Sequence, residues 1–212
     1  MAKLTRAERK ERKALAKATV AVLKTSARSY KWRVARDSLF KDHNGRFVEV
    51  QASIVNWAYK TRMAARIKPM ALDPVFWNIV GMPENAKLPL SFRAFGAWVC
   101  SAPTVVEDEI NEGDGSPETL AANILDWANS QMASPMLTAD CETYLEYLQT
   151  LSKGYFANRV AMLCLMGRYE DARAACLAAI EQDDSGGFGQ LVNDKIVNFP
   201  TMVIHWLDRN GQ

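Results

Sequence analysis

The sequence predicts an α+β protein, in which a small antiparallel sheet with flanking helices is followed by a C-terminal helical bundle. From Tyr30 to Ser101 apolar residues mainly alternate with polar ones, which is the period of a half-buried strand, whereas from Pro117 onward they recur at helical spacing. A chain of 212 residues, 49% of them hydrophobic, can bury a core without disulfides or a metal. The predicted parts are a basic leading helix (1–29), an antiparallel sheet subdomain (30–106) and a helical subdomain (116–212).

A cap predicts the first helix. Thr5 is followed three residues later by Glu8, so that each side chain can accept a hydrogen bond from the other residue's amide. The first turns, Arg6 to Lys13, are almost wholly charged, and apolar residues recur at helical spacing from Leu15 to Leu23. We therefore expect the front of the helix to project into solvent and its rear to pack on the protein.

A hairpin is predicted at Asn44-Gly45, which lies between two alternating segments. Both residues tolerate the positive φ of a tight reversal. A two-residue loop would place Lys41 opposite Val48, whereas a longer loop with a glycine bulge would change this register.

The rest of the predicted sheet region also follows from alternation and turn chemistry. Its remaining parts are an aromatic strand (30–35), a third strand (61–68) ended by Pro69, a short helix starting at Asp73-Pro74 and stopped by Gly81, and a fourth strand (90–100).

The C-terminal half begins with an acidic, turn-rich segment, Glu107 to Gly115, which is typical of a linker. Ser116-Pro117-Glu118 then predicts a helix start. Further helices are predicted over 139–151, 155–166, 170–181 and 190–207, the last kinked at Pro200.

The charge is divided unevenly along the chain. Residues 1–36 carry 12 Lys or Arg and 2 acids, residues 37–100 carry 8 and 5, and residues 101–212 carry 6 and 17. A formal total of +2 therefore hides segments of +10, +3 and −11. Such a dipolar chain favours salt-dependent contacts with charged partners, weak self-association among them.

The sequence predicts no catalytic residues, no metal site and no cofactor. The four cysteines form no Cys-x-x-Cys pair, and Cys141, Cys164 and Cys176 fit helical apolar faces, which favours reduced packing residues. His43 and His205 have no sequence neighbour suited to catalysis or metal binding. The glycine-rich segment 185–189 lacks the Lys-Ser/Thr of a phosphate loop and follows two aspartates, which indicates a connector.

One basic surface is a candidate site. If the strands share a face, Arg33, Arg62, Arg66 and Arg93 would lie together on it, with Lys31 and Lys68 adding charge. The aromatic residues near them in the sequence are Tyr30, Phe47, Trp57 and Tyr59. Cations interleaved with rings suit anions and single-stranded nucleic acid, because the charges neutralise phosphates while rings stack on bases. The alternative is a solvated sheet face without a ligand.

Residues 15–101 resemble an uncharacterised bacterial family, domain of unknown function 4304. The shared pattern comprises the leading helix, the aromatic strand, the Asn44-Gly45 hairpin, Lys68-Pro69, the segment from Asp73 to Trp77, and the segment from Glu84 to Arg93. The resemblance implies an α+β fold and identifies no active-site residues.

Residues 158–181 resemble the middle of a tetratricopeptide repeat, with Gly167 in the turn, Ala172 and Ala179 after it, and Phe156 as the aromatic anchor. Arg159-Val160 stands where that repeat has Leu-Gly, and no second copy follows. Since one unit cannot form a groove-bearing solenoid, the resemblance implies a packed helical hairpin.

We therefore expect a non-enzymatic protein-binding or regulatory module. The alternative is a nucleic-acid-binding module that uses the basic N-terminal half, and a third is an enzyme whose residues converge from several elements. No apolar segment approaches the roughly 20 residues of a membrane helix, and the start lacks the apolar stretch of a secretory signal, so we expect a cytoplasmic protein that does not bind a membrane.

Overall fold

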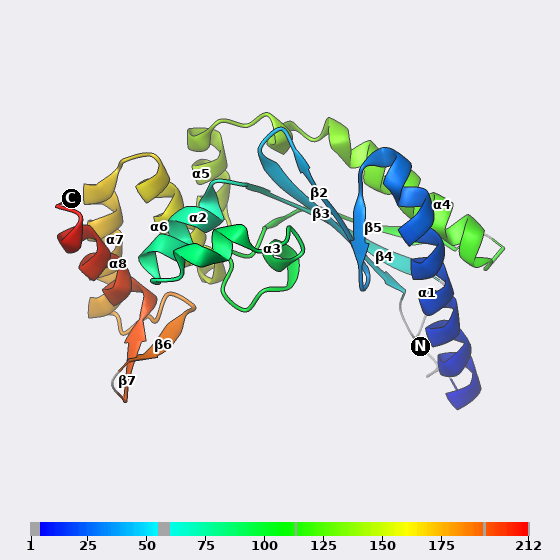
Figure 1. Ribbon diagram of the computed structural model, residues 1–212, viewed down its shortest axis with the longest axis horizontal. Helices are drawn as coiled ribbons and strands as arrows, with labels where there is room; N and C mark the ends of the chain where they lie inside the picture. The colour runs from blue at the N-terminus through cyan, green and yellow to red at the C-terminus, as the bar shows by residue number, and fades with distance from the viewer. Residues whose placement is uncertain (1–4, 55–59, 113, 193, 212) are drawn as a thin grey trace. The chain divides into compact units, whose positions relative to one another are not determined.

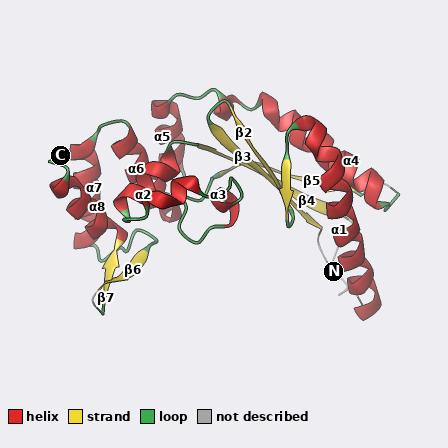
Figure 2. Ribbon diagram, in the orientation of Figure 1, coloured by secondary structure: helices red, strands yellow, loops and turns green. Residues whose placement is uncertain are grey.

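The computed structural model describes residues 5–54, 60–112, 114–192 and 194–211. It confirms the mixed α+β class, with an antiparallel five-stranded sheet, a small hairpin sheet and helices toward the C-terminus (Figures 1 and 2). The chain forms two compact units. The first contains the residues up to Lys68 together with Thr104–Leu137, and the second contains Pro69–Pro103 together with the residues from Thr138 onward. The boundaries of these two units differ from those of the three predicted parts.

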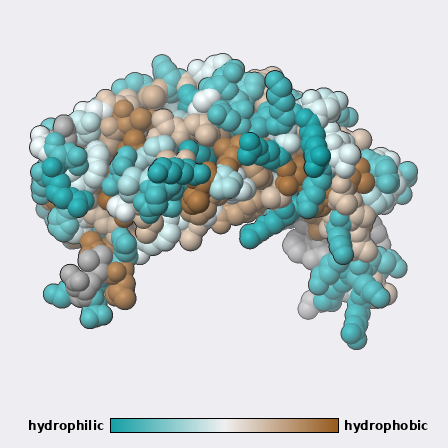
Figure 3. Space-filling view, in the orientation of Figure 1, coloured by the Kyte–Doolittle hydropathy of each residue, from teal (hydrophilic) through white to brown (hydrophobic). Residues whose placement is uncertain are grey.

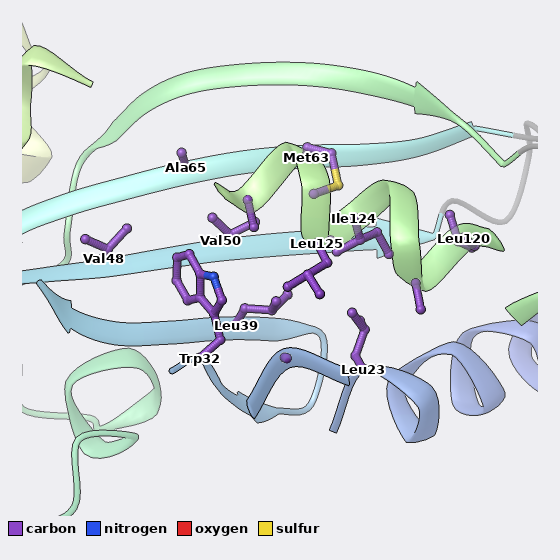
Figure 4. Close-up of a cluster of buried hydrophobic side chains, with 14 of the residues drawn as sticks. Leu23, Trp32, Leu39, Val48, Val50, Met63, Ala65, Leu120, Ile124 and Leu125 are labelled. Atoms are coloured by element: carbon purple, nitrogen blue, oxygen red, sulfur yellow. The ribbon is translucent and has the colours of Figure 1, made fainter. Parts of the chain in front are cut away.

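The first unit is a sheet covered on one face by two helices. Its strands, in spatial order, are β1 (Arg33–Ala35), β2 (Ser38–His43), β3 (Arg46–Ile54), β4 (Lys60–Pro69) and β5 (Thr104–Asn111). Helices α1 (Arg6–Ser26) and α4 (Pro117–Ser130) lie side by side in this unit (Figure 1). Leu23 of α1, Ile124 of α4 and Val50 of β3 meet in its buried core (Figure 4).

Local signals set the ends of several elements as predicted. Thr5 and Glu8 form the capping box of α1, and the Ser116 hydroxyl accepts from the Thr119 amide to cap α4. Asn44 and Gly45 have φ of 51° and 78° and close a two-residue turn, which places Lys41 opposite Val48. The predicted third strand is β4.

The second unit is mainly helical. It contains α2 (Leu72–Ile79), α3 (Phe92–Phe95), α5 (Cys141–Thr150), α6 (Phe156–Leu165), α7 (Tyr169–Glu181), β6 (Gly189–Val192), β7 (Lys195–Asn198) and α8 (Phe199–Arg209). Helices α6 and α7 form a helical hairpin, with Gly167 at φ 73° between them. Phe76 of α2 stacks on Phe199 of α8, with ring centroids 5.5 Å apart.

Two elements predicted in the middle of the chain are wrong. Residues 90–100 form the short helix α3 and a loop in place of a strand, because Arg93 turns to form an ion pair with the buried Asp73. The predicted linker over 107–115 mostly belongs to β5, where Glu109 forms ion pairs with Lys60 and Arg62 of β4.

The last helix is also shorter than predicted. Residues 189–198 form the β6–β7 hairpin, and α8 begins at Phe199. Pro200 therefore lies in the first turn, where no intrahelical donor is required of it, and causes no kink. The predicted aromatic strand is reduced to β1, since residues 27–30 form a 3-10 turn.

Candidate functional site

The exposed face of α1 carries a line of cations. The five side chains are exposed and recur at intervals of three, four or seven residues: Arg6, Lys10, Lys13, Lys17 and Lys24. At 3.6 residues per turn they lie within an arc of about 60°, and 1.5 Å per residue places the first and last about 27 Å apart. We call these five residues the basic stripe.

The opposite face of α1 is buried, which holds the basic stripe outward. Leu23 packs in the core of the first unit beside Ile124 (Figure 4). Arg12, only 5% exposed, donates two hydrogen bonds to the equally buried carboxylate of Glu112, which also accepts from the Thr61 hydroxyl at 3.1 Å. Because sheet and helix contacts fix this face, the stripe cannot rotate inward.

Acidic residues near α1 lie away from the basic stripe. Glu8 is held in the capping box, where the hydrogen bond from the Thr5 side chain lowers the pKa of its carboxyl. Glu11 lies about 130° around the helix from the centre of the stripe. On α4, Glu118 and Asp126 line a groove with Val22 of α1, on the side opposite the stripe.

The cations of the basic stripe are therefore available to a ligand. Within the described ranges, none of the five forms an ion pair with an acid. Figure 3 shows a hydrophilic surface over the N-terminal turns of α1, at the lower right of the view. An anion would meet a straight array of positive charge without displacing an internal partner first.

The structure brings together two of the four arginines that the sequence predicted as a site. Arg62 and Arg66 of β4 line one groove of about 890 Å³ on the sheet, together with Glu107 and Glu109 of β5. The Nε of Arg62 lies 3.5 Å from a Glu109 oxygen, and Arg66 lies 3.7 Å from the Glu49 carboxylate. Both cations are thus compensated internally, which lowers the attraction of this groove for an anion.

The other two arginines do not join that groove. Arg93 belongs to the second unit, where it pairs with Asp73 and donates to the Met70 carbonyl at 3.1 Å. Arg33 is exposed on the edge strand β1. Of the four predicted arginines, the described lining of this groove thus includes Arg62 and Arg66 alone.

Among the predicted stacking rings, Tyr30 is 51% exposed, whereas Phe47 is completely buried. Trp57 and Tyr59 lie outside the described residues. Lys68 is also buried, with its Nζ 5.3 Å from the centre of the Phe47 ring. Of the two predicted rings that the structure describes, Tyr30 alone is therefore exposed for stacking.

Glu49 is a buried carboxylate with an altered pKa. Burial raises the pKa of Glu49, against the hydrogen bond that the Ser38 hydroxyl donates to it at 2.9 Å and the positive charge of Arg66. A perturbed carboxylate can serve as a general acid, but Glu49 is not among the described residues that line the groove beside it. Its contacts indicate a structural part in the sheet.

Neither histidine belongs to the basic stripe or to the described lining of the groove on the sheet. His43 lies at the end of β2, and His205 is exposed on α8. Among the residues that the structure describes, no group of three or more His, Cys, Asp or Glu side chains could hold a metal ion.

The sequence predicted a basic leading helix but not the alignment of its cations on one exposed face. The signal was present, since its residues recur at helical spacing directly after a recognisable cap. What the pattern alone could not reveal is that Arg12, from the same charged segment, is buried.

Comparison with known proteins assigns this chain to no family. No family model, no curated protein and no solved structure matches this chain. No described helix is long and apolar enough to cross a membrane.

Proposed function

We propose that this chain is a nucleic-acid-binding module whose basic stripe contacts the phosphates of a duplex. The observation that carries the proposal is the alignment on one face of α1 of five exposed cations, none of which forms an ion pair with a described acid. Each phosphate that such a cation neutralises releases a condensed counterion, which is the main source of affinity in non-specific binding.

The composition of the exposed face favours phosphates over a protein surface. The exposed residues of α1 include no aromatic and no large aliphatic side chain. Protein interfaces need a desolvated core of such anchors and are depleted in lysine, whereas contacts to phosphates need only positioned positive charge.

The shape of the stripe favours a duplex over a single strand. A straight helix holds its charges in a rigid line, and a duplex offers a rigid array of phosphates with a higher charge density than a single strand. Binding to single strands relies on bases stacking on rings, and α1 exposes no ring for this.

Fluorescence anisotropy with a labelled duplex tests the proposal. Binding through five phosphate contacts should weaken with salt at a log-log slope of about −4.5. The double substitution Lys13→Ala/Lys17→Ala should reduce the slope to about −2.7, because two contacts are lost while alanine preserves the helix.

The matched control is Lys87→Ala/Lys195→Ala, which removes the same charge from exposed positions of the second unit. This control should leave the slope unchanged. Equal effects of the two double substitutions, or no binding to the duplex at low salt, would contradict the proposal that the basic stripe binds a duplex.

A protein partner is the second candidate, and the β6–β7 hairpin is the observation that favours it. Leu191 and Ile196 lie opposite each other on the two strands and are 68% and 74% exposed. Figure 3 shows hydrophobic side chains at this hairpin, at the lower left of the view. An exposed apolar cross-strand pair is a suitable anchor for another protein.

A pull-down from nuclease-treated native lysate separates the two candidates. A protein captured by the native chain and lost with Leu191→Ser/Ile196→Ser would support the hairpin interface. Leu88→Ser, at a residue 45% exposed elsewhere in the second unit, is the control and should retain the captured protein. Equal capture by all three chains would contradict a role for the hairpin.

A further inference from the structure

The second unit contains a pocket of about 520 Å³ between the end of α2, the β6–β7 hairpin and α8. Its inner residues are apolar and almost completely buried: Ile79 is 2% exposed, Val80 4% and Met202 7%. Val197 of β7 adds an apolar wall. A concave site of this volume with an apolar interior is typical of small-ligand pockets.

The rim of this pocket is polar and carries positive charge. Arg209, His205 and Asp208, all exposed residues of α8, line it together with Gln190. The Asp208 carboxylate accepts a hydrogen bond from Arg173 of α7 at 2.8 Å, which offsets its negative charge. The Nε of Arg209 donates to the His205 carbonyl at 3.2 Å, and this bond leaves the terminal nitrogens of the guanidinium as donors.

We propose that this pocket binds a small amphipathic carboxylate, with its aliphatic body against Ile79, Val80 and Met202 and its carboxylate at Arg209. The apolar interior favours a hydrocarbon body because burial removes that surface from water. The rim selects an anionic head, since a guanidinium pairs with a carboxylate through two parallel hydrogen bonds. This site is independent of the basic stripe, which belongs to the first unit.

Isothermal titration calorimetry with the whole chain tests this pocket, with sodium octanoate as the probe. Octanoate should bind in one-to-one stoichiometry with a Kd of about 1 mM or lower. Octylamine, which has the same aliphatic body and a positive head, should bind about 10-fold more weakly, and so should acetate, which lacks the body.

Two substitutions test separately how the carboxylate and the aliphatic body of octanoate contribute to binding. Arg209→Ala should weaken octanoate about 10-fold by removing the partner of the carboxylate, and Val197→Trp should weaken it similarly by filling the pocket. Lys195→Ala removes a cation from the same hairpin, outside the lining of the pocket, and should change the Kd less than about 2-fold. Thermal melts establish that each variant is folded.

Three results would overturn the proposal. They are an octanoate affinity that Arg209→Ala leaves unchanged, equal binding of octanoate and octylamine, and the absence of saturable heat with the folded native chain.

Discussion

At the scale of single residues, the four cysteines form no disulfide bond with one another, and they differ in burial. Cys141 is exposed at the start of α5, contrary to its predicted place on an apolar face. Cys164 and Cys176 are buried, and desolvation raises the pKa of each to about 12. Because the thiolate is the reactive form, we predict that iodoacetamide at pH 8 rapidly modifies one cysteine of the native protein and all four after unfolding. Mass spectrometry counts the adducts, and Cys141→Ser should abolish the rapid one. Rapid modification at a buried cysteine would contradict this prediction.

At the scale of elements, the ion pair between Arg12 and Glu112 ties α1 to the end of the sheet. The sequence predicted that this part of the helix projects into solvent, and for Arg12 that prediction is wrong. Arg12→Met should lower the free energy of unfolding by about 3 kcal/mol, since it leaves a buried carboxylate without its cation. The double substitution Arg12→Met/Glu112→Leu should recover most of this loss. Chemical denaturation measures both, and Lys13→Met, on the exposed face, should change stability by less than about 0.5 kcal/mol. Equal losses at positions 12 and 13 would show that the pair does not anchor the helix.

At the scale of the whole molecule, a basic N-terminal segment and an acidic C-terminal half favour head-to-tail association between copies. We predict weak oligomers at low salt that dissociate near physiological ionic strength, where charges more than about 8 Å apart are screened. Light scattering at two salt concentrations measures this. Lys13→Ala/Lys17→Ala should lower the association, whereas Lys87→Ala/Lys195→Ala, with the same change in net charge, should leave it intact. Oligomers that persist in high salt would require an apolar contact instead.

Features that depend on neighbouring residues could be predicted from the sequence alone. The Thr5–Glu8 cap, the Asn44-Gly45 turn and the register that follows from it each rest on contacts within a few residues. The fold class followed from the change of period along the chain. The cations of the basic stripe belong to the same class of signal, since helical spacing alone places them on one face.

Which charges are compensated within the protein could not be predicted from the sequence, because it depends on long-range contacts. The ion pairs Arg12–Glu112, Arg62–Glu109 and Arg93–Asp73 each join residues that are distant in the sequence, the first pair by 100 positions. No local sequence pattern predicts such pairs. The pocket in the second unit likewise takes its lining from α2, β6, β7 and α8. The physical reason is that burial and compensation of a charge depend on groups that chain folding brings together, whereas caps and turns depend on the residues beside them.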